Sequence, residues 1–447
     1  MRKLLLLLSV CLCACACVYA SDTDNDSIKA SIKAAKKEKI KQEWNTHFKF
    51  YGFVRNYLTY DSRQGYSANN GLYYFVPKDV NLNPKGQDLN ATPEFRYLNL
   101  TTRLGVNMFD YKYKNTYFAA KIECDFAFSL GATSAVALRL RHAYFTMMWK
   151  DLYIGKDKTA EVKLLMGQNW HPISVGYADI MSFETGSPFD VANRSPQITM
   201  DATFDKKYTV TGALIAQFQY ASTGPDGASV DYQKYALTPE AFVAFTYSDK
   251  GLTARAGVNI TSLRPRKYGY DTDSVKVIVK DRITTFCPYL FLEYKYKDLV
   301  VSAKTTYGQA GEQINLMSGY GVKKMNADGS WEYTPMQSSS TWGYIQYGKK
   351  YIGSVFGGYF KNFGTTAPLV STDKEHLFIN SFCDEGLMAA WRIIPSFKVK
   401  LGKFLFGVEY HYTAAQYGKN INNYGLATTD LHWVGNHRVL AMFQYEW

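Results

Sequence analysis

The residues of this sequence best suited to chemistry are basic ones that alternate with apolar ones. They are Arg55, Arg103, Lys121, Arg139 and Arg141. Side chains two residues apart point to the same face of a β-strand, so this spacing would gather the charges on one face. A face of guanidinium and ammonium groups beside a water-filled passage attracts small anions and disfavours cations. The chemistry expected of these residues is therefore charge selection.

Strands with one apolar face must position these side chains. The segments that carry most of them are 97–108, 116–128 and 134–149. In the third segment, Leu138, Leu140 and Tyr144 fall on one face, and Arg139 and Arg141 fall on the other. A Lys or Arg that faces lipid at mid-depth costs about 2–4 kcal/mol. We therefore expect the apolar set to face lipid and the charged set to line an interior.

The tight turns between these segments suggest how the strands pair. Pairing about residue 131 would place Glu123 opposite Arg139, and Lys121 opposite Arg141. Pairing about residue 112 would place Arg103 beside Lys121. The result would be a lateral basic row on the wall, although a slip in register would change the partners. The alternative is that these are ion-paired wall residues with no effect on selectivity.

The connection 169–193 contains the acidic residues that could oppose such a wall. They are Asp179, Glu184 and Asp190, interspersed with aromatic residues. Folded into the interior, this connection would narrow the passage, and its carboxylates would face the basic wall across a transverse field. The alternative is an ordinary exposed loop.

The end of the chain places these segments in a membrane barrel. Trp447, Tyr445, Phe443, Ala441 and Val439 form an apolar face that ends in aromatic residues, which is typical of the last strand of an outer-membrane barrel. The strands expected before it are 48–60, 97–108, 116–128, 134–149, 161–168, 195–203, 207–220, 239–247, 252–260, 283–296, 299–307, 341–348, 351–361, 379–392 and 399–413. The fold class is therefore all-β: a transmembrane antiparallel β-barrel of 16 strands, spanning residues 45–447.

The connections between these segments support the same topology. Short polar turns at 110–115, 205–206, 248–251, 297–298 and 349–350 alternate with long connections. In an outer-membrane barrel, short turns lie in the periplasm and long loops lie outside. An even number of strands would place both termini in the periplasm.

The start of the chain resembles an export signal. Arg2 and Lys3 precede an apolar run that ends at Ala20, so we expect a signal peptide at 1–20. Lipidation at Cys15 or Cys17 is the alternative to ordinary cleavage. Residues 21–44 are expected to form a short periplasmic linker or helical segment. Its 4,3 apolar spacing leaves open a trimeric coiled coil over 27–44.

Composition agrees with an exported barrel. The chain has 447 residues, 16% aromatic residues and a mean hydropathy of −0.25. No apolar run after the signal is long enough for a membrane helix. The net charge of +12 suggests a basic lumen, because nucleic acid is an improbable partner for an exported barrel. The three cysteines after the signal and the seven scattered histidines predict no metal site, no cofactor and no enzyme.

Several short motifs resemble the DcaP-like outer-membrane porins, which are trimeric channels associated with dicarboxylates. The motifs are Tyr51-Gly52-Phe53-Val54-Arg55, Arg103-Leu104-Gly105, Arg139-Leu140-Arg141-His142-Ala143-Tyr144 and Gly167-Gln168-Asn169-Trp170. The run 193–197 is similar to a segment of Bacteroidetes porin-like proteins. The resemblance covers mainly the first half. It implies a sixteen-stranded homotrimer whose lumen is lined by arginines, here Arg55, Arg103, Arg139 and Arg141.

These observations lead to a functional expectation with two alternatives. The expectation is an outer-membrane porin of a Gram-negative bacterium, a passive channel that prefers small anions such as dicarboxylates. The alternatives are a sugar-selective porin with an aromatic slide, and a non-conducting structural or adhesive barrel. The expected partners are membrane lipid, small solutes and the barrel-assembly machinery, which would bind the C-terminal strand.

Overall fold

The computed structural model describes residues 47–69, 71–129, 136–153, 159–182, 186–380 and 386–447. The expectations for the signal peptide, for Cys15 and Cys17, for the segment 21–44 and for Glu184 lie outside these ranges. No helix among the described residues is long and apolar enough to cross a membrane.

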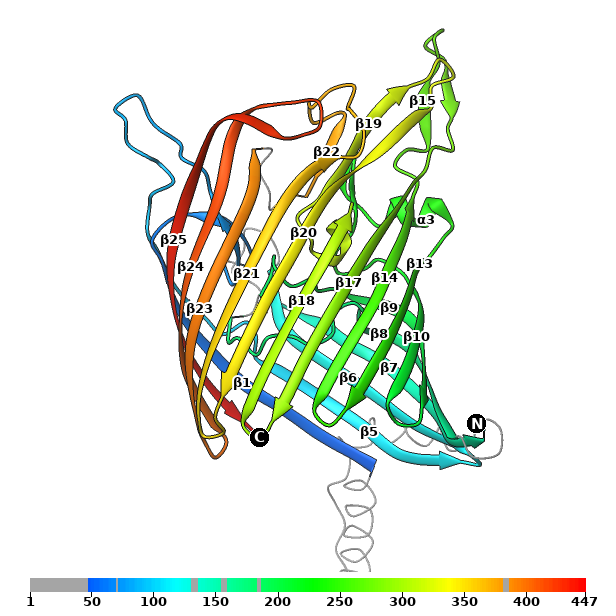
Figure 1. Cartoon of the computed structure of the whole chain (residues 1–447), viewed down its shortest axis with the longest axis vertical. Helices are drawn as coiled ribbons and strands as arrows, with labels where there is room; N and C mark the ends of the chain where they lie inside the picture. The colour runs from blue at the N-terminus through cyan, green and yellow to red at the C-terminus, as the bar shows by residue number, and fades with distance from the viewer. Residues whose placement is uncertain (1–46, 70, 130–135, 154–158, 183–185, 381–385) are drawn as a thin grey trace, which may run out of the picture. The chain divides into compact units, whose positions relative to one another are not determined.

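Within these ranges, the main sheet closes into a barrel of 16 antiparallel strands, the second of which is interrupted between β4 and β5 (Figure 1). The barrel strands are β1 (Phe48–Asp61), β4 (Glu94–Leu98) with β5 (Arg103–Tyr113), β6 (Thr116–Ser129), β7 (Val136–Tyr153), β8 (Thr159–Trp170), β9 (Arg194–Phe204), β10 (Tyr208–Ile215), β13 (Glu240–Asp249), β14 (Leu252–Leu263), β17 (Ile283–Tyr296), β18 (Leu299–Gln309), β20 (Trp331–Tyr347), β21 (Tyr351–Thr365), β23 (Leu387–Leu401), β24 (Phe404–Ile421) and β25 (Ala427–Glu446).

Shorter elements lie in the long connections. They are β2 (Gly65–Ala68), β3 (Tyr73–Pro77), β11 (Thr223–Gly224), β12 (Gly227–Ala228), α3 (Asp231–Ala236), β15 (Tyr268–Tyr270), β16 (Lys276–Ile278), η2 (Glu312–Ile314), β19 (Gly319–Met325) and β22 (Leu377–Ile379).

The first and last strands close the barrel. β25 pairs with β1 from Phe53 opposite Glu446 to Asp61 opposite Arg438. The closed antiparallel barrel predicted from the sequence is confirmed. Every apolar residue of its outer face then lies in a continuous sheet with no free edge, which is the only way a sheet can satisfy its backbone groups in a membrane.

Short turns lie at one end of the barrel, with the C-terminus, and long connections lie at the other (Figure 1). Asp205 and Lys206, between β9 and β10, both have positive φ, as the tightest hairpin turns require. The turns predicted near 205–206, 248–251, 297–298 and 349–350 are confirmed. The short outer connection predicted at 130–133 lies outside the described residues.

Several strand boundaries differ from the prediction. The strand expected at 341–348 begins at Trp331, as β20, and the strand expected at 207–220 ends at Ile215, as β10. The segments expected at 379–392 and 399–413 are β23, Leu387–Leu401, and β24, Phe404–Ile421. The turn between them is Gly402-Lys403, where Gly402 has a φ of +61°. Apolar and polar residues alternate almost without interruption across this two-residue turn. The alternation alone therefore placed the end of the strand before the turn too early in the sequence.

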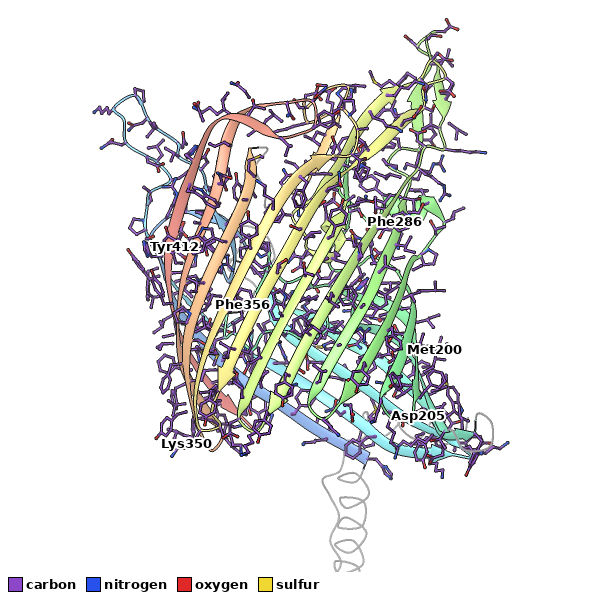
Figure 2. The ribbon with its side chains drawn as sticks, viewed as in Figure 1. Met200, Asp205, Phe286, Lys350, Phe356 and Tyr412 are labelled. Carbon is purple, nitrogen blue, oxygen red and sulfur yellow. The ribbon has the colours of Figure 1, made fainter. Side chains whose placement is uncertain are left out.

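Outward-facing positions are apolar around the barrel, as expected. Met200 and Phe286 lie on the outer face and are about half exposed, whereas Phe356 points inward and is buried (Figure 2). The inner face is polar only in part. On β17, Cys287, Tyr289 and Phe291 face inward and are buried. The interior of this side of the barrel therefore contains a packed core.

Candidate pore constriction

Basic side chains on β5, β6 and β7 alternate with two carboxylates in one ion-paired chain. Arg139 makes a two-pronged contact with Asp125, with donor–acceptor distances of 2.9 and 2.8 Å. Arg141 donates to Glu123 at 2.7 Å and to Asp125 at 2.9 Å. Arg103 lies 3.5 Å from Glu123. The guanidinium groups are held rigidly, because bidentate pairs fix both position and orientation.

The observed register corrects the predicted one. Arg139 stands opposite Asp125 rather than Glu123, and Lys121 stands opposite Tyr144 rather than Arg141. Arg103 also stands opposite Asp125 and not beside Lys121. Bulges within the β5–β6 and β6–β7 ladders shift the pairing, and spacing from a turn cannot reveal a bulge. The basic row is therefore interleaved with carboxylates, as the ion-paired alternative supposed.

The bulge in β7 also turns successive side chains inward. The register shifts between Glu123 and Cys124, so that the β7 residue Arg141 is extra, and both Arg141 and His142 are buried. Tyr144 then lies on the inner face beside Lys121, not on the outer face as predicted. The indole of Trp170 lies against both His142 and Arg141. One extra residue thus increases the density of polar groups on this part of the wall.

Two arginines of this wall make no ion pair among the described residues. Arg55 donates to Gln444 and to the Tyr57 hydroxyl, and its guanidinium lies 4.3 Å from the centre of the Phe53 ring. Arg194, at the start of β9, donates to Gln219 at 3.0 Å. Its guanidinium lies 4.6 Å from the Trp170 ring, and Nη1 has no hydrogen-bond partner. Both cations therefore lack an ion-paired carboxylate among the described residues.

We call the inner surface formed by these residues the arginine wall. It comprises Arg55, Arg103, Lys121, Arg139, Arg141 and Arg194, with Glu123 and Asp125. Lys121 also lies close to Glu123, at 3.2 Å. Six cations share two carboxylates among the described residues, so the wall has a formal excess of positive charge. The structure brings together all five basic residues predicted from the sequence.

Sequence reasoning missed Arg194. A signal was present, because this arginine directly follows the connection that was expected to fold inward. The residue that follows an in-folded connection begins its strand inside the barrel.

The connection between β8 and β9, residues 171–193, packs inside the barrel, and we call it the inner loop. Its apolar residues Ile173, Ile180, Phe189 and Val191 are buried in one cluster with rings from the opposite wall. An exposed loop, the alternative reading, would leave these side chains in water. Burying such side chains typically stabilises a protein by about 1.5–3 kcal/mol each.

Hydrogen bonds attach the central part of the inner loop to the barrel strands. Glu409 on β24 accepts bonds from the backbone nitrogens of Met181, at 2.5 Å, and Ser182, at 3.0 Å. Tyr57 on β1 donates to the Met181 carbonyl at 2.8 Å. Arg392 on β23 donates to the Ser187 carbonyl at 2.9 Å. The loop is therefore tied to strands that lie far from it in sequence.

The predicted acids of the inner loop contact lysines rather than the arginine wall. Asp190 is fully buried and lies 2.8 Å from the ammonium group of Lys304 on β18. Asp179 lies 2.6 Å from Lys398 on β23, although its carboxylate is largely exposed. The prediction that Asp190 faces the basic wall is wrong, because Asp190 forms a buried ion pair with Lys304 on the opposite side of the barrel. Glu184 is not described.

The first long connection also folds inward, which the sequence analysis did not predict. Tyr73, Tyr74 and Phe75 of β3 are buried. Arg392 donates to the carbonyls of Tyr74 and Phe75, at 2.8 and 2.6 Å. The signal was the apolar run 72–76 inside a connection that is otherwise polar.

Two adjacent cavities lie between the arginine wall and the in-folded segments. A cavity of about 90 Å³ is bounded by Arg55, Arg103 and Arg141 on the wall and by Ile180 to Ser182 on the inner loop. A second, of about 320 Å³, is bounded by Arg139 and Arg194. Gln219 and Tyr220 line both. The smaller cavity is narrow enough that a solute within it would touch the guanidinium groups.

No group of three or more His, Cys, Asp and Glu side chains within the described ranges is arranged to hold a metal ion. Two buried histidines lie beside carboxylates: His171 lies 3.4 Å from Glu240, and His411 lies 3.1 Å from Glu409. The His171–Glu240 pair joins the inner loop to β13.

The fold resembles solved outer-membrane channels. The outer membrane channel DcaP of Acinetobacter baumannii aligns with a TM-score of 0.61 at 16% identity, covering 90% of this chain and 97% of that one. The anion-selective porin from Comamonas acidovorans aligns with a TM-score of 0.49 at 8% identity, covering 90% and 99%. The trimer form of OmpT of Vibrio cholerae aligns with a TM-score of 0.48 at 12% identity, covering 90% of this chain and 99% of that one.

The resemblance to DcaP-like channels is confirmed at the level of the fold. No protein-family model matches the sequence, and no curated protein matches it.

Proposed function

We propose that this protein is an outer-membrane porin, a passive channel for small hydrophilic solutes that prefers anions such as dicarboxylates. The observation that carries the proposal is the pair of arginines, Arg55 and Arg194, that have no carboxylate partner among the described residues and line two cavities beside the arginine wall. In a low-dielectric surrounding, an uncompensated guanidinium attracts anions more strongly than in bulk water. Its planar fork also matches a carboxylate.

The rest of the molecule supports a membrane location. The outward face carries apolar and aromatic side chains on every part of the barrel that is described. The short turns and the C-terminus share one end, which we assign to the periplasm, with both termini there. The aromatic end of β25 is the element we assign to the barrel-assembly machinery. A homotrimer in membrane lipid is the proposed assembly.

Reversal potentials in a planar bilayer with a KCl gradient test this function. We expect the purified protein to conduct and to prefer chloride. The double variant Arg55→Gln/Arg194→Gln should lose most of that preference. The matched control, Lys207→Gln/Lys234→Gln, removes two exposed cations at the ends of the barrel and should leave the preference unchanged.

Three outcomes would overturn parts of the proposal. An absence of conductance would favour the structural or adhesive barrel. A cation preference of the wild-type protein would exclude anion selection. Liposome swelling that is faster with uncharged sugars than with dicarboxylates of similar size would favour the sugar-selective porin.

A further inference from the structure

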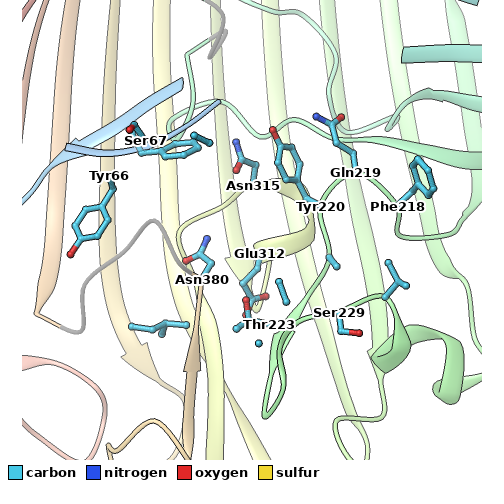
Figure 3. Close-up of a pocket in the computed structure, with 17 residues that line it drawn as sticks. Tyr66, Ser67, Phe218, Gln219, Tyr220, Thr223, Ser229, Glu312, Asn315 and Asn380 are labelled. Atoms are coloured by element: carbon cyan, nitrogen blue, oxygen red, sulfur yellow. The ribbon is translucent and has the colours of Figure 1, made fainter. Parts of the chain in front are cut away.

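A further cavity next to the arginine wall has a different chemical character. It has a volume of about 600 Å³ and lies between β2, the segment 218–230, η2 and the end of β22 (Figure 3). Its walls include the rings of Tyr66, Phe75, Phe218 and Tyr220. Its polar residues include Glu312 and Asn315. We call it the vestibule cavity.

Glu312 is an acid without a partner in the described structure. The residue is 3% exposed, and neither carboxylate oxygen has a hydrogen-bond partner or an ion pair. A buried carboxylate that is neither paired nor hydrogen-bonded is strongly unfavourable. Burial raises the pKa of Glu312 to about 8. Unsatisfied groups of this kind are rare and need an explanation, of which a ligand is one.

The backbone holds Glu312 in place. The Ile314 carbonyl accepts from the Ala192 nitrogen at 2.9 Å, and the Gln313 carbonyl accepts from the Asn193 side chain at 2.6 Å. η2 is therefore anchored to the inner loop on both residues that follow Glu312. In Figure 3 the Glu312 side chain lies between Asn380 and Ser229, among the residues that line the cavity. These contacts therefore hold Glu312 in a fixed position at the wall of the cavity.

The charge of the vestibule cavity is opposite to that of the protein. The chain carries a formal charge of +12, yet no lysine or arginine is among the described residues that line this cavity, and Glu312 is the one acid there. The ring faces of tyrosine and phenylalanine attract cations. The Asn315 side-chain oxygen is also buried and without a partner. Carboxylate, amide oxygen and ring faces are together the groups that bind a protonated amine.

The vestibule cavity adjoins the arginine wall. It shares Gln219, Tyr220 and Asn315 with the cavity of Arg55, Arg103 and Arg141. It shares Phe218, Gln219 and Tyr220 with the cavity of Arg139 and Arg194. A small molecule that spans the shared residues would have an acid at one end and guanidinium groups at the other.

We propose that Glu312 and the surrounding rings bind an ammonium group, so that the solutes this channel favours are small carboxylates that also carry a protonated amine, such as amino acids. The carboxylate half of this inference rests on the proposed anion preference. The ammonium half rests on the vestibule cavity alone.

Single-channel recordings with aspartate and succinate test the proposal, because the two dicarboxylates share a carbon skeleton and differ by one amino group. We expect aspartate to interrupt the current for longer than succinate does. Glu312→Gln should shorten the aspartate events by about tenfold, the typical effect of losing a charge-assisted hydrogen bond. The succinate events should not change. Glu332→Gln, an exposed acid on β20, is the matched control.

A third probe separates this inference from the proposed function. Ethanolamine carries an ammonium group and no carboxylate. If it interrupts the wild-type current and fails to do so in Glu312→Gln, the ammonium site stands even if the anion preference is absent. Equal event durations for aspartate in the wild type and in Glu312→Gln would overturn the inference. Interruption by glucose that depends on Glu312 as strongly as interruption by aspartate would also overturn it.

Discussion

The two sides of the barrel interior use the same strand alternation for different purposes. The arginine wall faces cavities and has more cations than carboxylates. The opposite side, which we call the loop-bearing wall, presents the inner faces of β13 to β24. It meets the inner loop with the buried rings of Phe291, Trp342 and Phe356. Its cations Lys304 and Lys398 are paired with loop carboxylates. The arginine wall supplies a positive electrostatic field, and the loop-bearing wall holds the inner loop in place.

The largest expected effect comes from the buried ion pair of the loop-bearing wall. Asp190→Ala would leave the Lys304 ammonium buried and uncompensated, which typically costs about 3–5 kcal/mol. We expect a lower midpoint in guanidinium unfolding of the detergent-solubilised barrel and a larger conductance, because the inner loop loses an anchor. The double variant Asp190→Leu/Lys304→Met should recover most of the stability. If Asp190→Ala changed neither the unfolding midpoint nor the conductance, the Asp190–Lys304 pair would not anchor the inner loop.

Loss of an apolar contact on the same wall should lower the stability of the barrel nearly as much. Phe189→Ala removes a ring of the inner loop that is 1% exposed and packs against the loop-bearing wall. We expect a loss of about 3 kcal/mol, in the range for large core truncations. The reversal potential should change little, since no charge is removed. A large shift in selectivity with unchanged stability would contradict the division of roles between the two sides.

On the arginine wall, substitutions of unpaired and of ion-paired arginines should shift the reversal potential by different amounts. Arg194→Gln removes a charge that has no ion pair among the described residues, so the reversal potential should move clearly toward cations. Arg139→Gln should move it less, because Asp125 keeps Arg141 as a partner. Bilayer recordings under one salt gradient compare the two directly. Equal shifts would show that ion pairing does not shield these charges.

Binding of aspartate in the vestibule cavity should depend on pH. With a pKa raised to about 8 by burial, Glu312 is mostly protonated at about pH 6 and mostly ionised at about pH 9. The titratable groups that face it are the phenol of Tyr320 and the thiol of Cys287, and neither can become a cation. The aspartate events should therefore lengthen as the pH rises over this range. Glu312→Gln should remove the trend.

The smallest effect should be that of salt on the anion preference. Charges are screened beyond about 10 Å at 0.1 M salt and about 3 Å at 1 M. The preference should weaken at high salt but persist, because solutes in the narrow cavity touch Arg55 and Arg141 directly. Complete loss at 1 M would indicate that the field acts only over long distances.

Much of the fold was predictable because alternation is local. The sixteen strands, the closure of β25 on β1 and the inward set of basic residues all follow from period-two patterns. The partners were not predictable. The bulge at Arg141 shifts the ladder, and no spacing encodes it. Lys304 and Lys398 contact loop acids more than a hundred residues away, so their role is visible only once the barrel closes.

The guanidinium of Arg392 has a mechanical consequence. It binds carbonyls of the inner loop and of β3 at the same time, at Ser187, Tyr74 and Phe75. Two connections that enter the barrel from separate points of its rim are thereby clamped to one strand. Neither can swing aside without breaking bonds that also secure the other. The two connections should therefore move together, and a substitution that displaces one of them should also displace the other.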